Sequence, residues 1–452
     1  MNAPLEIRIA AKKNRTLVGE GITLTISQRV TAALKMETVE LNRSRTTIRI
    51  QPLQGDLGTV TLSGADHLTL HRIHPLTQVG IAFDAPAGSA WNSDLNLLEY
   101  CRPLPVGRYK IAVSYRYGDS YAESIACNPV EVEVAPATLL SNELRWFGES
   151  SARDVLGSLW TALEGDRPVW FFQTCNKKDP SAVLTSVDLT IDSPPRDAKP
   201  CLAHLNDIAS MHFERYAVWI DGERLCWAAV ADTGRIAPQA SAVHGLGSGA
   251  ELADPPLQRR SGGFSAVVQS VQSGAVLIRV SADGSTEIQA CQPAAGRLVA
   301  WSEADEPIAL GPIEFDGGRV VATVLDQWLG AGHLLVAMEA EHGIEIARRG
   351  FDAATSQLEN DVVNLDRLPV GFLRGEPLDA SSLANSGGLA LLFASDSGWS
   401  VLTKDRNFRA AARGGSIPKL IGAPSGLFLM EHSTERGFLV TRLGEAPPPD
   451  PL

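Results

Sequence analysis

The segment RYAVWIDGERLCWAAV, from Arg215 to Val230, indicates two β-strands joined by a tight turn. Asp221-Gly222 is typical of a type I′ hairpin, because both central residues of that turn need a positive φ. Pairing outward from this dipeptide gives three cross-strand pairs: Tyr216 with Trp227, Ala217 with Cys226, and Val218 with Leu225. Both faces of the predicted hairpin are then apolar, whereas antiparallel sheets commonly keep one polar face in water. We therefore expect this hairpin to be covered on both sides.

Short apolar runs separated by polar turns continue from Val169 to Leu443. A glycine precedes four aliphatic runs, at Gly274, Gly332, Gly388 and Gly426. Their spacing of roughly 40 to 60 residues is in the range of propeller blades with variable loops, whose central strands are covered on both faces. Further hairpin turns are predicted at Asp283-Gly284, Asp316-Gly317-Gly318 and Ser397-Gly398. The sequence thus predicts an all-β chain with a six- or seven-bladed β-propeller over 137–444; a stack of sandwich domains is the alternative.

Residues 1–136 contain seven or eight short alternating segments, such as LEIRIAA (5–11) and TTIRIQPL (46–53). That density of short strands is typical of an antiparallel β-sandwich. The closing segment VEVEV, residues 130–134, predicts a strand with its valines inward and Glu131 and Glu133 outward.

Two stretches in this region carry a family resemblance. LPVGRYKIAVSY, residues 104–115, places a leucine, a glycine and a tyrosine as in the tyrosine corner of immunoglobulin-like domains. VGEGITLTI, residues 18–26, resembles the second strand of macroglobulin-type and intracellular-proteinase-inhibitor-type Ig-like domains. The resemblance covers only these two stretches, and it implies an Ig-like fold for residues 1–136.

Two other segments are assigned by pattern. Apolar residues recur at helical spacing after the first domain, which predicts a short helix over 150–164, although Gly157 weakens it. The proline-rich tail, 445–452, is expected to lie outside any sheet.

Charge and composition narrow the expected setting of the chain. Of its net charge of −12, residues 141–452 hold 39 acidic and 26 basic side chains, whereas 1–140 hold 13 and 14. The acidic balance argues against nucleic-acid binding by the larger part. Glu6 and Arg8 interrupt any signal-peptide core, and no apolar run is long enough to span a bilayer. We expect a cytoplasmic protein that does not bind membranes, with six reduced cysteines.

A search for catalytic and metal-binding motifs yields no complete one. Ser248, in HGLGSGAEL (244–252), lacks the context of a nucleophile elbow, and the chain has no Gly-Lys dipeptide for a P-loop. Two groups have some metal-ligating residue types but unsuitable spacing: Cys201, His204, Asp207 and His212, and His67, His71 and His74. Carboxylates that could converge in a propeller channel include Asp207, Asp326 and Asp361. We predict no catalytic residue, no metal and no cofactor.

The candidate binding residues are basic. In LNRSRTTIRI, residues 41–50, the strand period places Arg43, Arg45 and Arg49 on one face, with Ile48 and Ile50 on the other. Such a face is either an ordinary solvated surface or a docking site for an acidic protein partner.

The first functional hypothesis is a non-catalytic adaptor or structural subunit of a larger cytoplasmic assembly. One alternative is a propeller hydrolase or lyase that binds a glycan or lactone in its channel. The other is an inhibitor or sensor module, which rests on the resemblance of VGEGITLTI.

Overall fold

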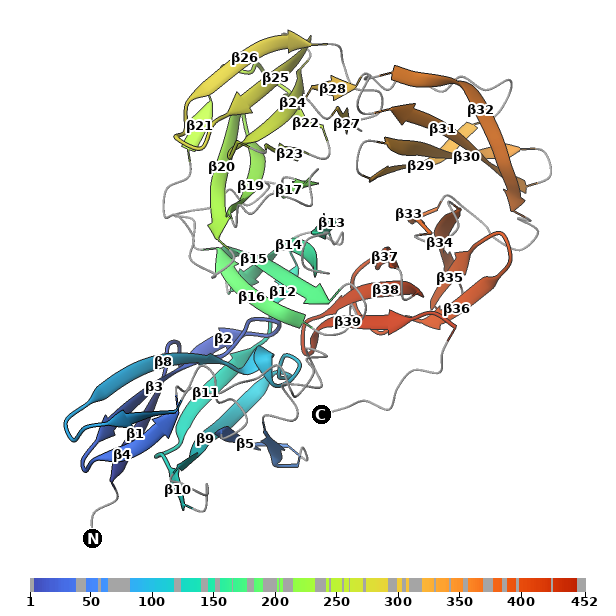
Figure 1. Ribbon diagram of the computed structural model, residues 1–452. Helices are drawn as coiled ribbons and strands as arrows, with labels where there is room; N and C mark the ends of the chain where they lie inside the picture. The colour runs from blue at the N-terminus through green and yellow to red at the C-terminus, as the bar shows by residue number, and fades with distance from the viewer. Residues whose placement is uncertain are drawn as a thin grey trace.

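The computed structural model is almost entirely β, with antiparallel sheets, which confirms the predicted all-β class (Figure 1). The structure describes residues 4–37, 46–55, 58–63, 82–117, 123–139, 145–150, 155–164, 166–176, 183–189, 201–202, 204–205, 214–231, 241–243, 245–253, 256–259, 261–270, 274–291, 299–302, 306–308, 319–328, 331–340, 343–352, 357–368, 377–383, 388–395, 398–423 and 426–444. Within these ranges, no helix is long and apolar enough to cross a membrane.

The N-terminal part contains two main sheets. One has the order β1 (Leu5–Ala11), β3 (Thr23–Val30) and β8 (Ala90–Asn96). The other has the order β2 (Arg15–Leu17), β11 (Val130–Ala135), β9 (Gly107–Tyr117), β5 (Thr46–Pro52) and β6 (Val60–Leu62), with β10 (Glu123–Ala126) also paired to β9. β4 (Leu34–Glu37) pairs with β7 (Ala82–Ala85), and a short 3-10 helix, η3, spans Leu97–Glu99.

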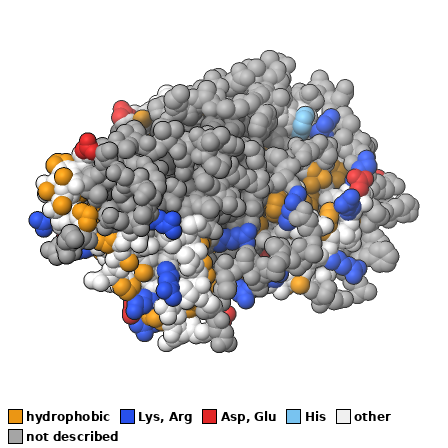
Figure 2. Space-filling view, turned by 60° about the horizontal axis from the view of Figure 1, so that its bottom comes forward, with side chains coloured by type: hydrophobic (Ala, Val, Ile, Leu, Met, Phe, Trp, Pro, Cys, Tyr) orange, Lys and Arg blue, Asp and Glu red, His pale blue; other side chains and the backbone are white. Residues whose placement is uncertain are grey.

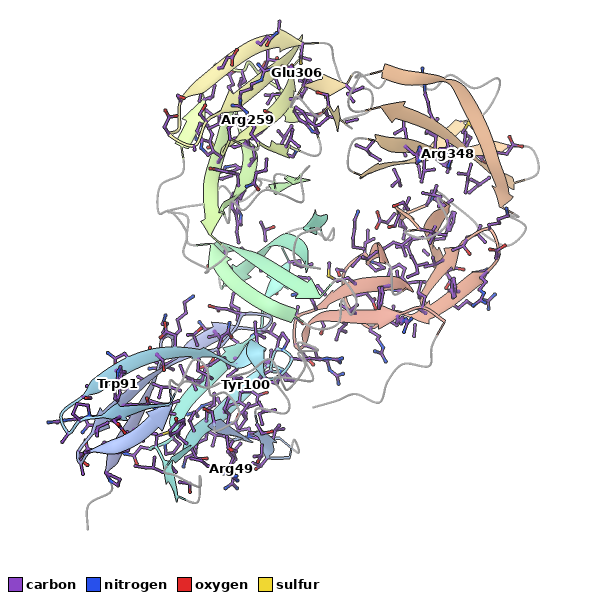
Figure 3. The ribbon with its side chains drawn as sticks, viewed as in Figure 1. Arg49, Trp91, Tyr100, Arg259, Glu306 and Arg348 are labelled. Atoms are coloured by element: carbon purple, nitrogen blue, oxygen red, sulfur yellow. The ribbon has the colours of Figure 1, made fainter. Side chains whose placement is uncertain are left out.

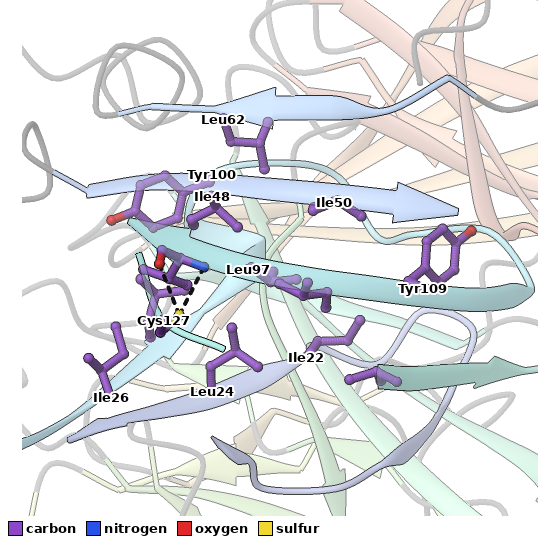
Figure 4. Close-up of a cluster of buried hydrophobic side chains, with 14 of the residues drawn as sticks. Ile22, Leu24, Ile26, Ile48, Ile50, Leu62, Leu97, Tyr100, Tyr109 and Cys127 are labelled. Carbon is purple, nitrogen blue, oxygen red and sulfur yellow. Dashed lines mark hydrogen bonds between the residues drawn. The ribbon is translucent and has the colours of Figure 1, made fainter. Parts of the chain in front are cut away.

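Alternating side chains from both sheets form one core (Figure 4). Leu24 of β3 and Ile48 of β5 are fully buried within it. β11 alternates as predicted: Val132 and Val134 are buried and Glu131 and Glu133 are exposed. The period of two in the sequence therefore sets which face of each strand is dry.

Tyr109, in the stretch that resembles a tyrosine corner, forms a local hydrogen bond at the start of β9. The Tyr109 hydroxyl donates a hydrogen bond to the Pro105 carbonyl oxygen at 2.7 Å, four residues upstream. The ring is 2% exposed, and burial raises the pKa of Tyr109. This contact fixes the chain where it enters β9.

We expect Tyr109→Phe to lower the free energy of unfolding by about 1 kcal/mol, the usual net value of one hydrogen bond, because the Pro105 carbonyl loses its donor while the ring stays packed. Urea unfolding of the two proteins measures the difference. A variant as stable as the wild type would show that the corner adds nothing beyond apolar burial.

The rest of the chain forms further sheets that follow one another around a ring (Figure 1). The first contains β12 (Thr138–Leu139), β13 (Arg145–Ser150), β14 (Val155–Glu164), β15 (Arg167–Asn176) and β16 (Val183–Leu189). The second contains β17 (Cys201–Leu202), β19 (Glu214–Asp221), β20 (Arg224–Ala231) and β21 (Ser241–Val243). The third contains β18 (His204–Leu205), β22 (Glu251–Leu252), β23 (Leu257–Gln258), β24 (Phe264–Ser270), β25 (Gly274–Val280) and β26 (Thr286–Cys291).

A pair of short strands, β27 (Ala300–Trp301) and β28 (Pro307–Ile308), comes next. It is followed by a sheet of β29 (Arg319–Trp328), β30 (Ala331–Ala340), β31 (Gly343–Asp352) and β32 (Gln357–Leu368). The last two sheets contain β33 (Asp379–Ser382), β34 (Leu389–Ser395), β35 (Gly398–Leu402) and β36 (Asn407–Ala411), and then β37 (Lys419–Ala423), β38 (Gly426–Ser433) and β39 (Gly437–Arg442).

The β19–β20 hairpin is covered on both faces, as predicted. Trp219 is 2% exposed and meets Trp170 of the preceding sheet edge to face, with ring centroids 4.7 Å apart. Trp227, on the other face, is 6% exposed and meets Phe264 of the following sheet at 5.7 Å. The two tryptophans thus pack this sheet against the sheets on both of its sides.

The predicted register of this hairpin is wrong by one residue at the turn. Asp221 pairs with Arg224, so that Gly222 and Glu223 are the central residues, and Val218 pairs with Trp227. Gly222 has a φ of 61°, and the guanidinium of Arg224 contacts the Asp221 carboxylate across the turn. Because the partner of every residue moves by two positions, each side chain keeps its predicted face.

The helix predicted over 150–164 is wrong, because Val155–Glu164 is strand β14. β14 pairs with β15 along its whole length, from Val155 opposite Asn176 to Glu164 opposite Arg167. The same apolar residues that recur at helical spacing also suit a strand inside a sheet, and the ladder with β15 outweighs the local preference.

Apolar clusters join the other neighbouring sheets in turn. They include Leu277 with Trp301, Ala300 with Val336, Leu335 with Leu391, and Leu392 with Leu429. Leu139 of β12, in the first sheet, lies in a cluster with Phe428 and Met430 of the last sheet. Leu139 and Phe438 of β39 also pack against the core of the N-terminal part, and the Val106 amide donates to the Glu435 carbonyl oxygen at 2.8 Å. The N-terminal part therefore contacts both ends of the series of sheets.

Among the cysteines whose side chains the structure describes, those at 101, 127, 226 and 291 are free thiols. Cys127 accepts a hydrogen bond from the Val113 amide and donates one to the Val113 carbonyl oxygen, and burial raises the pKa of its thiol (Figure 4). The predicted turn at 316–318 and the proline-rich tail lie outside the described residues.

Candidate functional site

The predicted basic strand is β5, and its alternation matches the sequence pattern. Ile48 and Ile50 are buried, and Arg49 between them is exposed. Figure 3 shows Arg49 on the outside of the N-terminal sheets. Arg43 and Arg45 lie outside the described residues, so the structure places one member of the predicted trio.

Neighbouring strands add more cations to the face that carries Arg49. Arg49 pairs with Ala112 of β9, and side chains two residues apart on a strand share a face. The exposed residues of β9 on that face are basic: Arg108, Lys110 and Arg116. We call Arg49, Lys110 and Arg116 the cationic face; the small or polar side chains around them are Thr47, Thr61, Ala112 and Ser114.

In the described residues, the acidic side chains that form ion pairs across this sheet belong to β11. Glu131 pairs with Arg108 at 3.1 Å, and Glu133 pairs with Arg15 of β2 at 3.4 Å. All four side chains are at least half exposed, so each pair is worth little in stability.

The positive charges of the cationic face are not neutralised by ion pairs within the described residues. Within the described part of the chain, Arg49, Lys110 and Arg116 have no ion pair and no side-chain hydrogen bond. In the view of Figure 2, Lys and Arg side chains are more prominent than Asp and Glu among the described residues. Three cations lie on one sheet face, and Glu131, the described carboxylate opposite Lys110, is in an ion pair with Arg108. The cations therefore create a positive potential that attracts anionic groups.

Two members of this face were missed from the sequence. Lys110 and Arg116 occur in GRYKIAVSYRY, where the same period of two that identifies Arg49 was available. The sequence alone does not give the pairing of β5 with β9, which places Arg49 opposite Ala112, 63 positions further along the chain.

The other candidates do not form a site in the described residues. Ser248 is exposed in a loop between β21 and β22, where Gly245, Gly247 and Gly249 all have positive φ. Cys201 and His204 belong to strands of different sheets, since β17 pairs with β19 and β18 pairs with β23. Among the residues that the structure describes, no three His, Cys, Asp or Glu side chains gather as metal ligands.

The remaining sequence candidates are placed only in part. Asp326 lies on β29 and Asp361 on β32, two strands at opposite edges of one sheet. The others lie outside the described residues: His67, His71, His74, Asp207 and His212.

One buried carboxylate escaped the sequence analysis. Glu431 of β38 is 1% exposed, and its Oε1 accepts hydrogen bonds from the Trp399 indole at 2.8 Å and from the amides of Arg413 and Gly414 at 3.1 and 3.3 Å. Three donors on one oxygen fix the β36–β37 connection and the neighbouring sheet onto β38. This geometry gives Glu431 a structural role.

Comparison with known proteins finds no matching family model and no matching curated protein. Among solved structures, the chain is similar to the sporulation control protein Spo0M from Bacillus subtilis, with 11% identity over 54% of this chain and 91% of that one and a TM-score of 0.18. It is also similar to the SapL1 lectin in complex with alpha methyl fucoside, with 11% identity over 68% and 96% and a TM-score of 0.28. Beta-1,2-mannobiose phosphorylase from Listeria innocua matches with 9% identity over 78% and 92% and a TM-score of 0.26. The TM-scores are low and these proteins differ in function, so the all-β class of this chain rests on its own strands.

Proposed function

We propose that this chain is a non-catalytic interaction protein of the cytoplasm, in which an Ig-like sandwich (1–136) carries a docking face and a β-propeller (137–444) forms the larger body. The cationic face of β5 and β9 is the observation that carries the proposal. Its three unpaired cations are exposed, and they lie on a sheet whose other face is a packed core. A rigid charged surface of this kind suits recognition of an acidic protein partner.

Two features support the proposed architecture. The Tyr109–Pro105 hydrogen bond is the contact expected of a tyrosine corner in an Ig-like domain. Successive sheets that are apolar on both faces, together with contact between the first and last sheets through Leu139 and Phe428, favour a propeller over a row of separate sandwiches. In the described part of 137–444, six larger sheets and the short β27–β28 pair agree with six or seven blades.

We expect the triple variant Arg49→Ala, Lys110→Ala and Arg116→Ala to associate with poly-L-glutamate about tenfold more slowly at low ionic strength, because electrostatic steering acts mainly on the association rate. Its rate should also depend less steeply on salt than that of the wild type. Stopped-flow mixing between low and physiological ionic strength measures both quantities.

A matched control removes the same net charge elsewhere. Arg319, Arg406 and Arg409 are exposed on the ring of sheets, and their triple replacement by Ala should leave the association rate close to wild type. Equal slowing in both variants would mean that binding follows net charge alone, and no measurable association of the wild type would overturn the docking role. Adding Arg43→Ala and Arg45→Ala to the first variant tests whether those two residues belong to the same face.

A further inference from the structure

Strand β26, at the outer rim of the third sheet in the ring, is exposed on both faces (Figure 1). Thr286, Glu287, Ile288, Gln289 and Ala290 are all exposed. Ile288 is 52% exposed, the largest value among the large hydrophobic residues that the structure describes. Its cross-strand partner Ile278 is fully buried, so the sheet continues outward beyond the cover of its neighbours.

β26 is also an edge strand. In the described part of the chain it pairs only with β25, so one row of backbone donors and acceptors faces outward. Edge strands are usually protected by Lys, Pro or a bulge. The strand TEIQAC contains neither Lys nor Pro, its one charged residue is Glu287, and its register with β25 is continuous.

Two other outer strands are protected. β36 has Arg409 at its centre, so self-pairing of this strand would place two arginines opposite each other. Its Phe408 and Ala410 are also partly buried against the neighbouring strands. β39 has Phe438 packed against the N-terminal core. β26 shares neither form of protection.

We propose that β26 is a self-pairing edge, through which two copies of this chain form one continuous antiparallel sheet about a twofold axis at Ile288. This register places Ile288 of each copy against Ile288 of the other and covers the exposed apolar side chain. It sets Glu287 opposite Gln289, so that no two like charges are opposed. Within each copy Arg279 contacts Glu287 at 3.6 Å and Gln289 at 3.0 Å, and it also contacts Glu306, so Glu287 and Gln289 stay on the face opposite Ile288.

The sequence of β26 favours a second copy of this chain as the partner that pairs with the strand. Around Ile288, an acidic residue on one side is balanced by a neutral amide on the other, and this pattern is self-complementary in the antiparallel direction. The interface is isologous and closes at two copies. It is separate from the cationic face, so either proposal can fail alone.

Sedimentation velocity of the full chain tests the assembly. We expect a dimer that persists in 1 M NaCl, where the Debye length is about 3 Å and contacts of the cationic face are screened. Ile288→Lys should weaken dimerisation at least about tenfold by opposing two charges at the centre. Val320→Lys, at another exposed apolar residue (48%), is the matched control and should leave the dimer intact. The proposal is overturned if the wild type remains monomeric at a concentration of about 100 µM. It is also overturned if Ile288→Lys leaves the dimer unaffected.

Cysteine crosslinking tests the register. In a Cys291→Ser background, Ile288→Cys should form an intermolecular disulfide on mild oxidation, because residues on the twofold axis face their own copies. Gln289→Cys, the next residue, points to the opposite face and is displaced from its own copy, so it should not crosslink. Crosslinking at Gln289→Cys and not at Ile288→Cys would overturn the proposed pairing even if the protein is a dimer.

Discussion

Trp219→Ala is expected to lower the free energy of unfolding by about 3–5 kcal/mol, the usual range for deleting a buried aromatic side chain. Trp219 is 2% exposed and Trp170, its edge-to-face partner, is fully buried. The substitution removes a large apolar surface and leaves a cavity between two sheets that backbone pairing does not connect at this point. The lost stability should therefore come from weaker packing between these two sheets.

Equilibrium unfolding in urea, followed by tryptophan fluorescence and circular dichroism, measures this loss. Trp227→Ala removes the equivalent contact with Phe264 on the opposite face and should have a similar cost. Val320→Ala, at an exposed side chain, is the control and should change stability by less than about 0.5 kcal/mol. A double replacement of Trp170 and Trp219 should show coupling of about 0.5–1.5 kcal/mol. A loss below about 1 kcal/mol for both single tryptophan variants would contradict the two-sided packing.

The hairpin shows how much of the fold could be predicted. Face assignment depends only on the alternation of side chains, so the burial of Trp219 and Trp227 on opposite faces followed from the sequence. The register depends on which two residues occupy the turn, and Asp-Gly fits more than one choice. In the structure, Gly222 is the first central residue of the turn, and Asp221 pairs with Arg224. Turn preferences of single residues do not predict this contact.

The wrong assignment of β14 has a related cause. Val155, Leu156, Leu159 and Trp160 suit a helix by spacing, but a strand with both neighbours present accepts apolar residues at any position. Periodicity cannot separate a buried strand from a short helix when both faces are dry. Pairing with the surrounding strands makes this segment a strand, and the positions of those strands depend on how the whole ring of sheets packs.

The candidate site was predictable only strand by strand. Arg49 was found because β5 alternates, and Lys110 and Arg116 were within reach of the same rule. Their combination on one surface requires the long-range pairing of β5 with β9. Glu431 was out of reach, because its three donors come from a neighbouring sheet and from the β36–β37 connection.

His432, next to Glu431 on β38, gives the chain a buried imidazole. It is 3% exposed and packs edge to face against Phe438, with ring centroids 5.4 Å apart. Its backbone is held on both sides, since its amide donates to the Ser416 hydroxyl at 2.9 Å and its carbonyl oxygen accepts from the Gly415 amide at 3.1 Å. Burial lowers the pKa of His432 to about 4, from an ordinary value near 6.5. The imidazole is therefore neutral in the folded protein at neutral pH.

The unfolded chain binds a proton at this residue below about pH 6.5, whereas the folded protein does so only near pH 4, so acid favours unfolding across that window. The His432 contribution is complete above pH 6.5 and decreases by about 3 kcal/mol as the pH falls to 4, because each pKa unit corresponds to about 1.4 kcal/mol. We expect His432→Gln to remove this component, so that the stability of the variant falls less steeply than that of the wild type between pH 6.5 and 4. Urea unfolding at half-unit pH steps measures the difference, and the acid titration of carboxylates is common to both proteins. Parallel stability curves for the two proteins, or an NMR titration of the His432 ring with a midpoint near 6.5, would show that the imidazole charges without cost and that β38 is open to water at this position.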